Sequence, residues 1–334
     1  MPNQNLSLKT EFYSRRQILK LGLASVGLTG AGLVVSTLGH KQKTKVKVPP
    51  LPKTEATAAN SFNPLYMLRD FDYGIVKQEN GRTVREFNFE ARTSTLQLTK
   101  AVDFASWNIN GRVPGPTMRV TEGDRVRVIF HNHAGHSHSL HFHGIHSADM
   151  DGVVPIRHGS SKVFEFDAEP FGIHLYHCHI APVTRHIGKG LYGMFIIDPR
   201  SGRPPADEIV MVMSGYDVNE DGRNELYAFN GIPDYYKQHP VPIQQDQLIR
   251  LYLLNMTELE PALTFHIHAN MFRVYRTGRT LTPSEETDVI TMGVAERHIL
   301  EFSYRTPGMY MFHPHQDQIA EAGCMGNFLV VGNT

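Results

Sequence analysis

Residues 172–179 read Gly-Ile-His-Leu-Tyr-His-Cys-His, and residues 308–315 repeat the pattern as Gly-Met-Tyr-Met-Phe-His-Pro-His. In each stretch a glycine stands five residues before the first of two histidines that are separated by one residue. Another His-x-His pair comes earlier in each half of the chain, at 141/143 and 266/268, after a strand-like run that ends in asparagine. The chain therefore contains two copies of one β unit.

The pattern around these motifs is that of strands, and no window shows a long helical period. Short alternating runs are separated by Gly, Pro and Asn turn signals at the spacing typical of sandwiches. The clearest strands are predicted at 83–90, 125–130, 162–166, 191–197, 248–254 and 326–331. Each half has about 135 residues, which is enough for one Greek-key β-sandwich. We therefore predict an all-β chain of two sandwich domains that meet near the proline-rich residues 199–205.

The composition excludes several classes of protein. The 334 residues are 41% apolar and 20% charged, an ordinary globular balance. Lys+Arg and Asp+Glu tie at 33 each, but residues 1–47 hold eight basic residues and one acidic residue. Residues 48–334 therefore hold 25 basic and 32 acidic residues and are acidic overall. This argues against a nucleic-acid partner. Two cysteines are too few for a disulfide framework.

The N-terminus is predicted to be a targeting segment rather than part of the fold. Residues 14–20 read Ser-Arg-Arg-Gln-Ile-Leu-Lys and precede an apolar, glycine-rich run from Leu21 to about Gly39. This resembles a twin-arginine (Tat) export signal, which implies a periplasmic or extracellular protein. We assign residues 1–45 to the signal and 46–64 to a linker. A membrane tether through this segment is the alternative interpretation, and no other segment resembles a membrane span.

Histidine is the unusual residue, with 19 in the chain. Six His-x-His pairs occur where random placement gives about one, at 131/133, 136/138, 141/143, 177/179, 266/268 and 313/315. On a strand, residues i and i+2 point to the same face. The four pairs at matching places in the repeat could direct eight imidazoles at one site. Neutral imidazole is a good ligand for copper, zinc or iron.

Cys178 narrows the choice of metal. It stands between His177 and His179, so its side chain points to the opposite face of the strand and can bind a separate metal there. His186, eight residues on, and His138, three residues before His141, are the partners in reach. Two His and one Cys around a trigonal ion form the blue-copper arrangement. A buried thiol that acts as a small hydrophobe is the alternative for Cys178 and the default for the other cysteine, Cys324.

These motifs resemble those of the two-domain multicopper oxidases, laccase-like relatives of the copper nitrite reductases. The resemblance spans about residues 83–334 and rests on His138-Ser-Leu-His-Phe-His-Gly144, on His177-Cys178-His179 and on the second-half pairs. It implies two cupredoxin-like Greek-key β-sandwich domains, at 65–200 and 201–334. It also implies copper as the cofactor, about four ions per chain: one type 1, one type 2 and two type 3.

The resemblance also assigns the copper ligands. The type 1 copper would be held by His138, Cys178 and His186. The type 2 copper would be held by His141 and His266. The type 3 pair would be held by His143, His177, His179, His268, His313 and His315.

Departures from the family pattern carry information. The second half has Leu263 in place of His138 and Pro314 in place of Cys178, so only the first domain is expected to keep a type 1 site. Leu191 stands where the axial methionine of the type 1 copper is usual. The loss of a thioether donor should raise the reduction potential of that copper. Met194 is nearby, but its position fits a strand residue better.

Asp151 is the proton-relay candidate, because Asp151-Gly152 resembles the acidic position near type 2 copper. A plain Asp-Gly turn is the alternative interpretation. Asp149 is the second choice and Glu321 a weaker one.

The function implied is oxidation of a phenol, an aromatic amine or a metal ion at type 1 copper, coupled to four-electron reduction of O₂ to water. The family also implies a homotrimer in which the first domain of one chain meets the second domain of the next. A copper nitrite reductase is the nearest alternative, but it has Asp where this chain has His141 and lacks the histidine at 179. A non-catalytic blue-copper electron carrier is the other alternative. A cuprous-ion oxidase is a further alternative, although the 13 methionines are scattered and form no methionine-rich insert that would support it.

Overall fold

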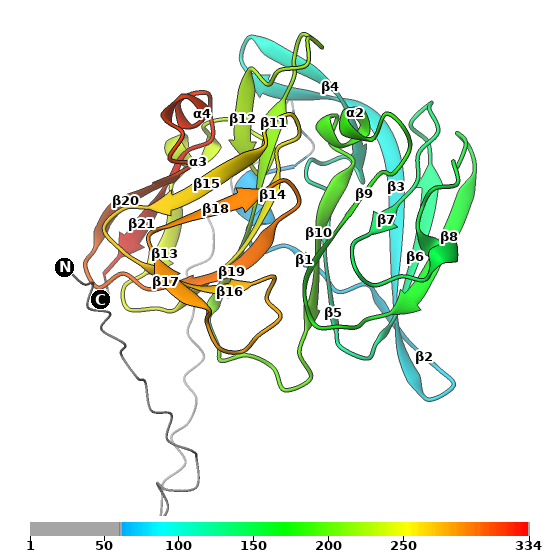
Figure 1. Ribbon diagram of the computed structural model, residues 1–334, viewed down its shortest axis with the longest axis horizontal. Coiled ribbons are helices and arrows are strands. Elements are labelled where there is room, and N and C mark those ends of the chain that lie inside the picture. The colour runs from blue at the N-terminus through cyan, green and yellow to red at the C-terminus, as the bar shows by residue number, and fades with distance from the viewer. Residues whose placement is uncertain (1–59, 61, 333–334) are drawn as a thin grey trace, which may run out of the picture. The chain divides into compact units, whose positions relative to one another are not determined.

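The computed structural model describes residues 60 and 62–332. The expected export signal and nearly all of the linker lie outside these residues. About half of the residues are in strands and very few are in helices, so the predicted all-β, two-sandwich fold is confirmed. The described residues belong to one compact unit, and Figure 1 shows its strands gathered into two layered groups. Among the described residues, no helix is both long enough and apolar enough to cross a bilayer.

Two sheets form the first sandwich. One has the order β1 (Phe71–Asp72), β5 (Thr117–Thr121), β10 (Tyr192–Asp198), β9 (Gly172–His177), β7 (His141–Phe142). The other has the order β2 (Ile75–Glu79), β3 (Arg82–Thr99), β6 (Arg125–Asn132), β8 (Ser161–Asp167), with β4 (Val102–Ile109) paired to β3. Two short helical segments belong to this part of the chain, the 3₁₀ turn η2 (Ala148–Met150) and α2 (Val183–Gly188).

Two further sheets form the second sandwich. One has the order β12 (Leu226–Phe229), β11 (Asp207–Tyr216), β14 (Ile249–Met256), β19 (Arg297–Phe302), β16 (Phe272–Arg276), β17 (Glu285–Thr287). The other has the order β13 (Val241–Gln244), β21 (Gly326–Val331), β20 (Gly308–His313), β15 (Ala262–Ile267), β18 (Val289–Gly293). Helices α3 (Tyr235–Gln238) and α4 (Asp317–Glu321) complete it. The strand β20 occupies the place that β9 has in the first sandwich.

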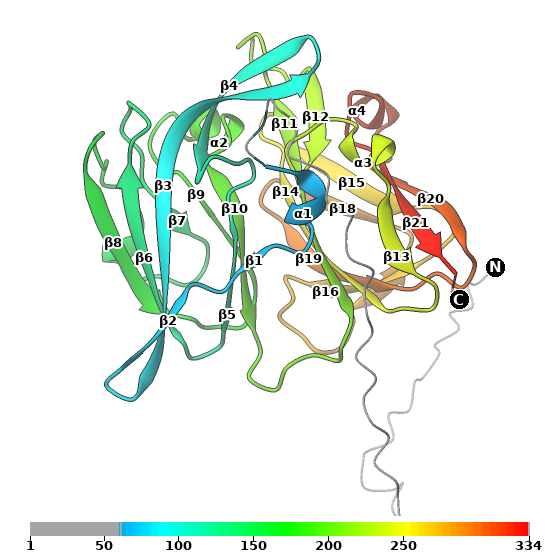
Figure 2. The same ribbon diagram turned by 180° about the vertical axis from the view of Figure 1, so that it is seen from behind.

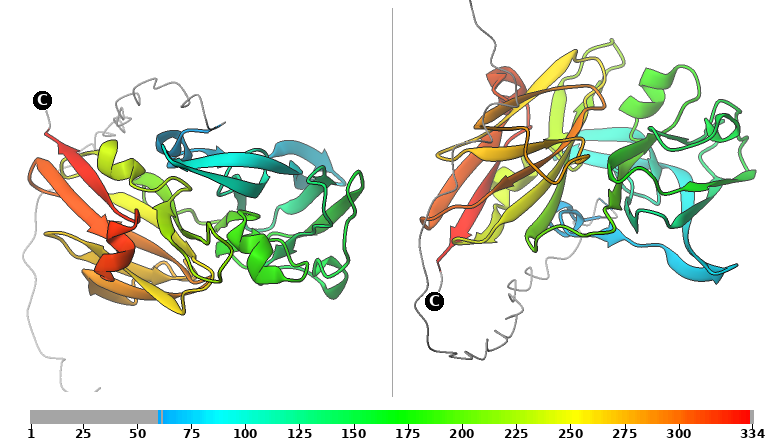
Figure 3. Two further views of the ribbon diagram at one scale, coloured as in Figure 1. Left: turned by 90° about the horizontal axis from the view of Figure 1, so that it is seen from above. Right: turned by 60° about the horizontal axis from the view of Figure 1, so that its bottom comes forward.

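Burial patterns explain how the two sandwiches are joined. Along β6 buried and part-exposed residues alternate, because one face of that strand meets the core and the other meets water. Along β14 every residue is buried. Leu251 and Leu253 face the core of the second sandwich, whereas Tyr252 and Leu254 belong to an apolar cluster shared with the first sandwich. The two sandwiches therefore lie side by side on a continuous apolar interface (Figure 3).

The segment before β1 packs on the second sandwich. Leu65 and Leu68, in and just after α1 (Pro64–Met67), belong to its core, and Figure 2 shows α1 against these strands. The amide of Val210 donates to the carbonyl of Leu68 at 2.9 Å, and the hydroxyl of Tyr236 donates to the carbonyl of Pro64 at 2.7 Å. The residues just before the first strand of the first sandwich thus pack on the second sandwich.

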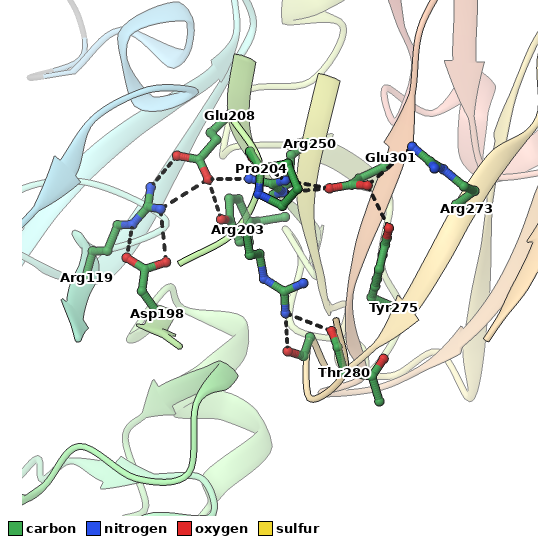
Figure 4. A network of polar contacts seen from close by, with 12 residues as sticks. Arg119, Asp198, Arg203, Pro204, Glu208, Arg250, Arg273, Tyr275, Thr280 and Glu301 are labelled. Atoms are coloured by element: carbon green, nitrogen blue, oxygen red, sulfur yellow. Dashed lines mark hydrogen bonds and ion pairs between the residues drawn. The ribbon is translucent and has the colours of Figure 1, made fainter. Parts of the chain in front are cut away.

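A buried ion network crosses the interface between the sandwiches (Figure 4). The guanidinium of Arg119 on β5 donates to Asp198 at 2.8 Å and to Glu208 on β11 at 2.8 Å. Arg250, which is 2% exposed, bridges Glu208 at 3.2 Å and Glu301 at 2.8 Å. Each of these five charged groups has a partner of opposite charge, which offsets the desolvation cost of burying them. The network fixes how the strands of the two domains lie against each other.

Candidate metal centre

His138, Cys178 and His186 form a buried group in the first sandwich. Nδ1 of His138 and Nδ1 of His186 are 3.1 Å apart. Sγ of Cys178 lies 3.1 Å from Nδ1 of His186 and 3.8 Å from Nδ1 of His138. The exposed fractions are 0% for His138 and Cys178 and 5% for His186. Three ligand atoms therefore point at one small space that is shielded from water.

The local backbone explains why these three residues meet. Cys178 directly follows β9, and its amide donates to the carbonyl of Leu191 at 2.9 Å. The amide of Leu191 donates to the carbonyl of His186 at 3.3 Å, so the end of α2 is tied to the residue beside the thiol. His138 is held by an isolated bridge to Ile156. The three ligands thus come from two loops and from helix α2.

The axial position predicted from sequence also has a clear environment. Leu191 is 1% exposed and belongs to the same core cluster as Cys178. Met194 belongs to the cluster between the sandwiches instead. The thioether is therefore directed to the domain interface, and the residue beside the thiol is the hydrocarbon Leu191.

Burial keeps these groups neutral in the metal-free chain. Desolvation lowers the pKa of His138 to about 3 and that of His186 to about 4, and nearby imidazoles add to the effect. Burial raises the pKa of the Cys178 thiol. Nε2 of His138 is buried without a hydrogen-bond partner, an arrangement that costs free energy unless the ring has another role.

A second group in the first sandwich contains His141, His143, His177 and His179. Strand pairing places His141 opposite His177, and Nε2 of His143 lies 2.9 Å from Nε2 of His177. The ring centroid of His179 is 4.8 Å from that of His141. Burial is the main cause that lowers the pKa of His143 to about 3 and that of His177 to about 4. The imidazoles of His143 and His177 are therefore neutral and can each offer a lone pair to a metal.

The second sandwich repeats this geometry. His266 lies opposite His313 in the strand register, and Nε2 of His268 lies 3.0 Å from Nε2 of His313. The ring of His315 is 5.3 Å from that of His266, and burial lowers the pKa of His268. Among the described residues, each group of convergent ligand atoms draws on one sandwich only.

An aspartate contacts one histidine in each of the two four-histidine groups. Oδ1 of Asp151, the predicted relay residue, lies 3.0 Å from Nδ1 of His141, and its backbone carbonyl lies 3.1 Å from the same nitrogen. In the second sandwich the carbonyl of Asp288 lies 2.7 Å from Nδ1 of His266, and its Oδ2 lies 3.8 Å away. Such contacts fix the ring and leave Nε2 for the metal.

Two further residues contact these histidines, Asp288 and His146, and the sequence motifs do not point to Asp288. Nε2 of His146 is 3.1 Å from Nδ1 of His141 and 3.5 Å from Oδ1 of Asp151. Asp288 immediately precedes β18, the strand that pairs with β15. Only that long-range pairing brings it to His266, so no local motif could have identified it.

The other candidates lie elsewhere. Asp149 is exposed and accepts a hydrogen bond from Ser147. Glu321 lines a cavity of about 510 Å³ next to Tyr235. The remaining His-x-His residues contact protein groups: His131 contacts Ser161, His133 contacts Glu90, and the ring of His136 lies on Trp107.

The donor sets fit copper. One thiolate and two imidazoles in a dry, rigid space are the ligands of a blue-copper ion, and imidazole clusters suit copper of the other types. Nε2 of His138 has no hydrogen-bond partner. This is consistent with a ring whose Nδ1 is the metal-binding atom. Fold and site together define a copper protein built from two cupredoxin-like domains.

Comparisons with known proteins agree with this class. Family models described as multicopper oxidase match residues 90–202 and 202–333. A solved structure of a multicopper oxidase is 46% identical, with a TM-score of 0.81, and the match covers 82% of this chain and 98% of that one. This chain belongs to the multicopper oxidases and is a two-domain member related to the copper nitrite reductases.

Two relatives illustrate the breadth of the family. The copper-containing nitrite reductase of Neisseria meningitidis is 28% identical over 270 residues, which is 73% of this chain and 68% of the relative. The blue copper oxidase of Nitrosomonas europaea is 25% identical, with a TM-score of 0.67, and the match covers 74% of this chain and 86% of that one. Membership of this family makes the protein a copper-binding oxidoreductase.

Proposed function

We propose that the protein is a laccase-like oxidase that takes single electrons from a small reducing substrate at the Cys178 group and reduces O₂ to water at a trinuclear copper centre. The observation that carries this proposal is histidine at both positions that differ in the nitrite reductases, 141 and 179. The ring centroids of these two residues are 4.8 Å apart, so both belong to one cluster. Eight cluster histidines, four from each domain, provide donors for three further copper ions.

Bound copper would supply the one-electron chemistry, while the chain holds the ions and manages protons. Cys178 is joined to His177 and His179 by single peptide bonds, and its side chain lies on the other face of the strand. One short segment therefore carries ligands of both centres and sets the spacing between them. The carbonyl of Cys178 lies 2.8 Å from Nδ1 of His177, which leaves Nε2 of that ring facing the cluster.

Asp151 is proposed as the proton relay. Its side chain is 36% exposed, and its Oδ1 lies 3.0 Å from Nδ1 of His141. The carboxylate therefore touches both water and a cluster ligand. It accepts a hydrogen bond from the Nδ1–H of His141, which orients Nε2, and it exchanges a proton with solvent as oxygen is reduced.

We further propose a homotrimer in which the first domain of one chain meets the second domain of the next. In the described residues, the close contacts among cluster histidines join residues of a single domain. A half-cluster of four imidazoles needs a second half, and a head-to-tail contact that closes as a ring supplies one at every interface. The twin-arginine motif supports export to the periplasm or beyond.

The decisive experiment counts copper in the fully loaded, purified protein and follows oxygen uptake with a reducing dye. The proposal predicts about four copper ions per chain, one of them blue, and dye-driven oxygen consumption. Two ions per chain without oxygen uptake would overturn the trinuclear centre. One blue copper without oxygen uptake would indicate an electron carrier.

Nitrite reduction is the second candidate, because the Neisseria meningitidis relative named above is a copper-containing nitrite reductase. Anaerobic assay of the same protein with nitrite and the reducing dye separates the two functions. The oxidase proposal predicts no nitrite consumption above that of a copper-free control.

A further inference from the structure

One His-x-His pair, at 131/133, has neither member among the copper ligands assigned above. His131 is the last residue but one of β6, and His133 directly follows that strand. The amide of His133 donates to the carbonyl of Ala91 on β3 at 2.9 Å, so the extended pairing continues through it. Residues i and i+2 of an extended chain point to the same face, and the two imidazoles are therefore neighbours.

The pair lies on the outer face of its sheet. Buried and part-exposed residues alternate along β6, and His131 is one of the part-exposed set. The side chain of His133 is 54% exposed. The four-histidine group of the first sandwich lies on or beside β7 and β9, which belong to the other sheet. Water and dissolved ions can therefore reach the pair without entering the copper site.

Both rings are fixed through Nδ1. Nδ1 of His133 lies 2.6 Å from Oε1 of Glu90, and Nδ1 of His131 lies 2.7 Å from Oγ of Ser161 on the neighbouring strand β8. Hydrogen bonds, first from Arg92 and then from His133, lower the pKa of Glu90 to about 2. Because an ionised carboxylate only accepts, the Nδ1–H of His133 donates to it, and Nε2 of that ring keeps its lone pair. The hydroxyl of Ser161 can accept the Nδ1–H of His131 in the same way.

The spacing of the two rings is close to that of the copper-ligand pairs. The ring centroids of His131 and His133 are 6.4 Å apart, and their planes are inclined by 29°. In the two four-histidine groups, the ring centroids within each His-x-His pair are 4.9 to 6.0 Å apart. The contact of Glu90 with Nδ1 also repeats the contact between Asp151 and Nδ1 of His141 at 3.0 Å. The pair therefore has the spacing and the supporting contact of a metal-binding pair, with solvent on its open side.

We propose that His131 and His133 together bind one labile divalent transition-metal ion through their Nε2 atoms, at a site separate from the copper centres. Two neutral imidazoles suit Cu²⁺, Ni²⁺ and Zn²⁺, and the general order of affinities places Cu²⁺ first. Water completes the coordination, so the ion exchanges with the solution more readily than one held by a closed set of protein ligands. Such an ion takes no part in the electron transfer or the oxygen reduction proposed above.

The surroundings of the pair disfavour a hard ion such as Mg²⁺ or Ca²⁺. Such ions need several oxygen ligands at once. The two carboxylate oxygens of Glu90 are already in contact, one with Arg92 and one with His133, and Oγ of Ser161 holds His131. The Nε2 atoms of the pair are therefore the donors on offer, and imidazole nitrogen binds transition metals.

Calorimetric titration of Zn²⁺ into the copper-loaded, full-length protein tests the site. Zn²⁺ is redox-inactive and stands below Cu²⁺ in the order of affinities, so it does not displace bound copper. His131→Gln and His133→Gln each remove one imidazole, and the double variant removes both. His239→Gln is the matched control, because His239 is an exposed histidine without a His-x-His partner. Unchanged blue absorption shows that each variant keeps the Cys178 group.

We expect one Zn²⁺ ion per chain to bind to wild type and to His239→Gln. Each single variant should bind Zn²⁺ at least about 100-fold more weakly, because the second imidazole closes the chelate intramolecularly. The double variant should not bind Zn²⁺ at this site, and Mg²⁺ should not compete with Zn²⁺ in wild type. Equal affinity in wild type and the double variant, or a loss in only one of the single variants, would overturn the proposal. Competition by Mg²⁺ would also overturn it, because it would indicate oxygen ligands.

Chemical modification gives a second readout, which locates the ion. Diethyl pyrocarbonate acylates free imidazole nitrogens, and mass spectrometry of peptides identifies the modified residues. We expect Zn²⁺ to protect His131 and His133 and to leave His239 as reactive as before. Equal modification of the pair with and without Zn²⁺ would place the ion elsewhere and overturn the proposal.

Discussion

The two sandwiches present the same four histidines on matching strands, yet they differ on the opposite face of those strands. The first sandwich places His138, Cys178 and His186 there. The backbone contact between Leu191 and His186 at 3.3 Å recurs between Cys324 and Ile319 at 3.3 Å, so Ile319 is the counterpart of His186. The second sandwich therefore holds Leu263, Pro314, Ile319 and Cys324 at the matching positions.

This difference separates what the fold needs from what a metal needs. Leu263 and Cys324 are 0% exposed and Ile319 is 4% exposed, so the second sandwich fills the space with hydrocarbon and one thiol. Packing of the sandwich requires buried volume there and accepts either solution. The cluster face keeps its histidines in both domains because each half-cluster supplies ligands. The opposite face could lose its metal without loss of the fold.

The largest effect is expected from Cys178→Ser. A hydroxyl does not replace the thiolate, so the blue absorption should disappear and about one copper ion per chain should be lost. Oxygen uptake should fall on the order of a thousandfold or more, because members of a catalytic unit fail together. Copper analysis, absorption spectroscopy and an oxygen electrode measure the three effects. Cys324→Ser is the control and should keep all copper; loss of blue colour from that variant would contradict the comparison.

The next effect concerns the two supporting carboxylates. Oδ1 of Asp151 is 3.0 Å from its histidine, whereas Oδ2 of Asp288 is 3.8 Å from its own and the backbone carbonyl holds that ring. Asp151→Asn should therefore lower kcat about 100-fold and Asp288→Asn about tenfold, within the range for groups that orient metal ligands. Copper content should stay near wild type in both. Equal losses in the two variants would show that the domains contribute alike.

The sequence predicted the repeated parts of the molecule well. The run 326–331 coincides with β21, and 125–130 lies within β6, because alternation is a local signal. The pairs at 141/143 and 177/179 come together in the first sandwich and those at 266/268 and 313/315 in the second, since strand geometry puts i and i+2 on one face. These features depend on neighbours in the chain, which is why a single sequence reveals them.

Features that depend on distant pairing were not predicted. Asp288 reaches His266 only through the pairing of β15 with β18. The expected first domain begins at residue 65, yet Leu65 enters the core of the second sandwich. One cavity is lined by Glu258 and Leu259 of the second sandwich and by residues of α2 from the first. Such contacts follow from how two domains dock, and no periodicity in the sequence encodes them.

The acid stability of the copper-free protein is a further test of the difference between His138 in the first sandwich and Leu263 in the second. Burial lowers the pKa of His138 to about 3, below the value of about 6.5 for an unfolded histidine. Below pH 6.5 the unfolded chain binds a proton that the folded chain does not, so the free energy of unfolding falls as the pH falls. His138→Leu copies Leu263 of the second domain and should reduce this slope by about 1.4 kcal/mol per pH unit between pH 4 and 6. Urea titrations across that range measure the slope, and an unchanged slope would mean that His138 is protonated in the folded state.

The smallest effect is expected at the axial position, where Leu191 faces the core that contains Cys178. Leu191→Met conserves volume, so stability should change little. A thioether near the copper stabilises the oxidised ion less well than the imidazoles do, but better than hydrocarbon does. The potential of the blue copper should therefore fall on the order of tens of millivolts. Redox titration of the blue absorption measures this shift, with Met194→Leu as the control because that side chain lies in the cluster between the sandwiches. A larger shift from Met194→Leu than from Leu191→Met would reverse the assignment of the axial residue.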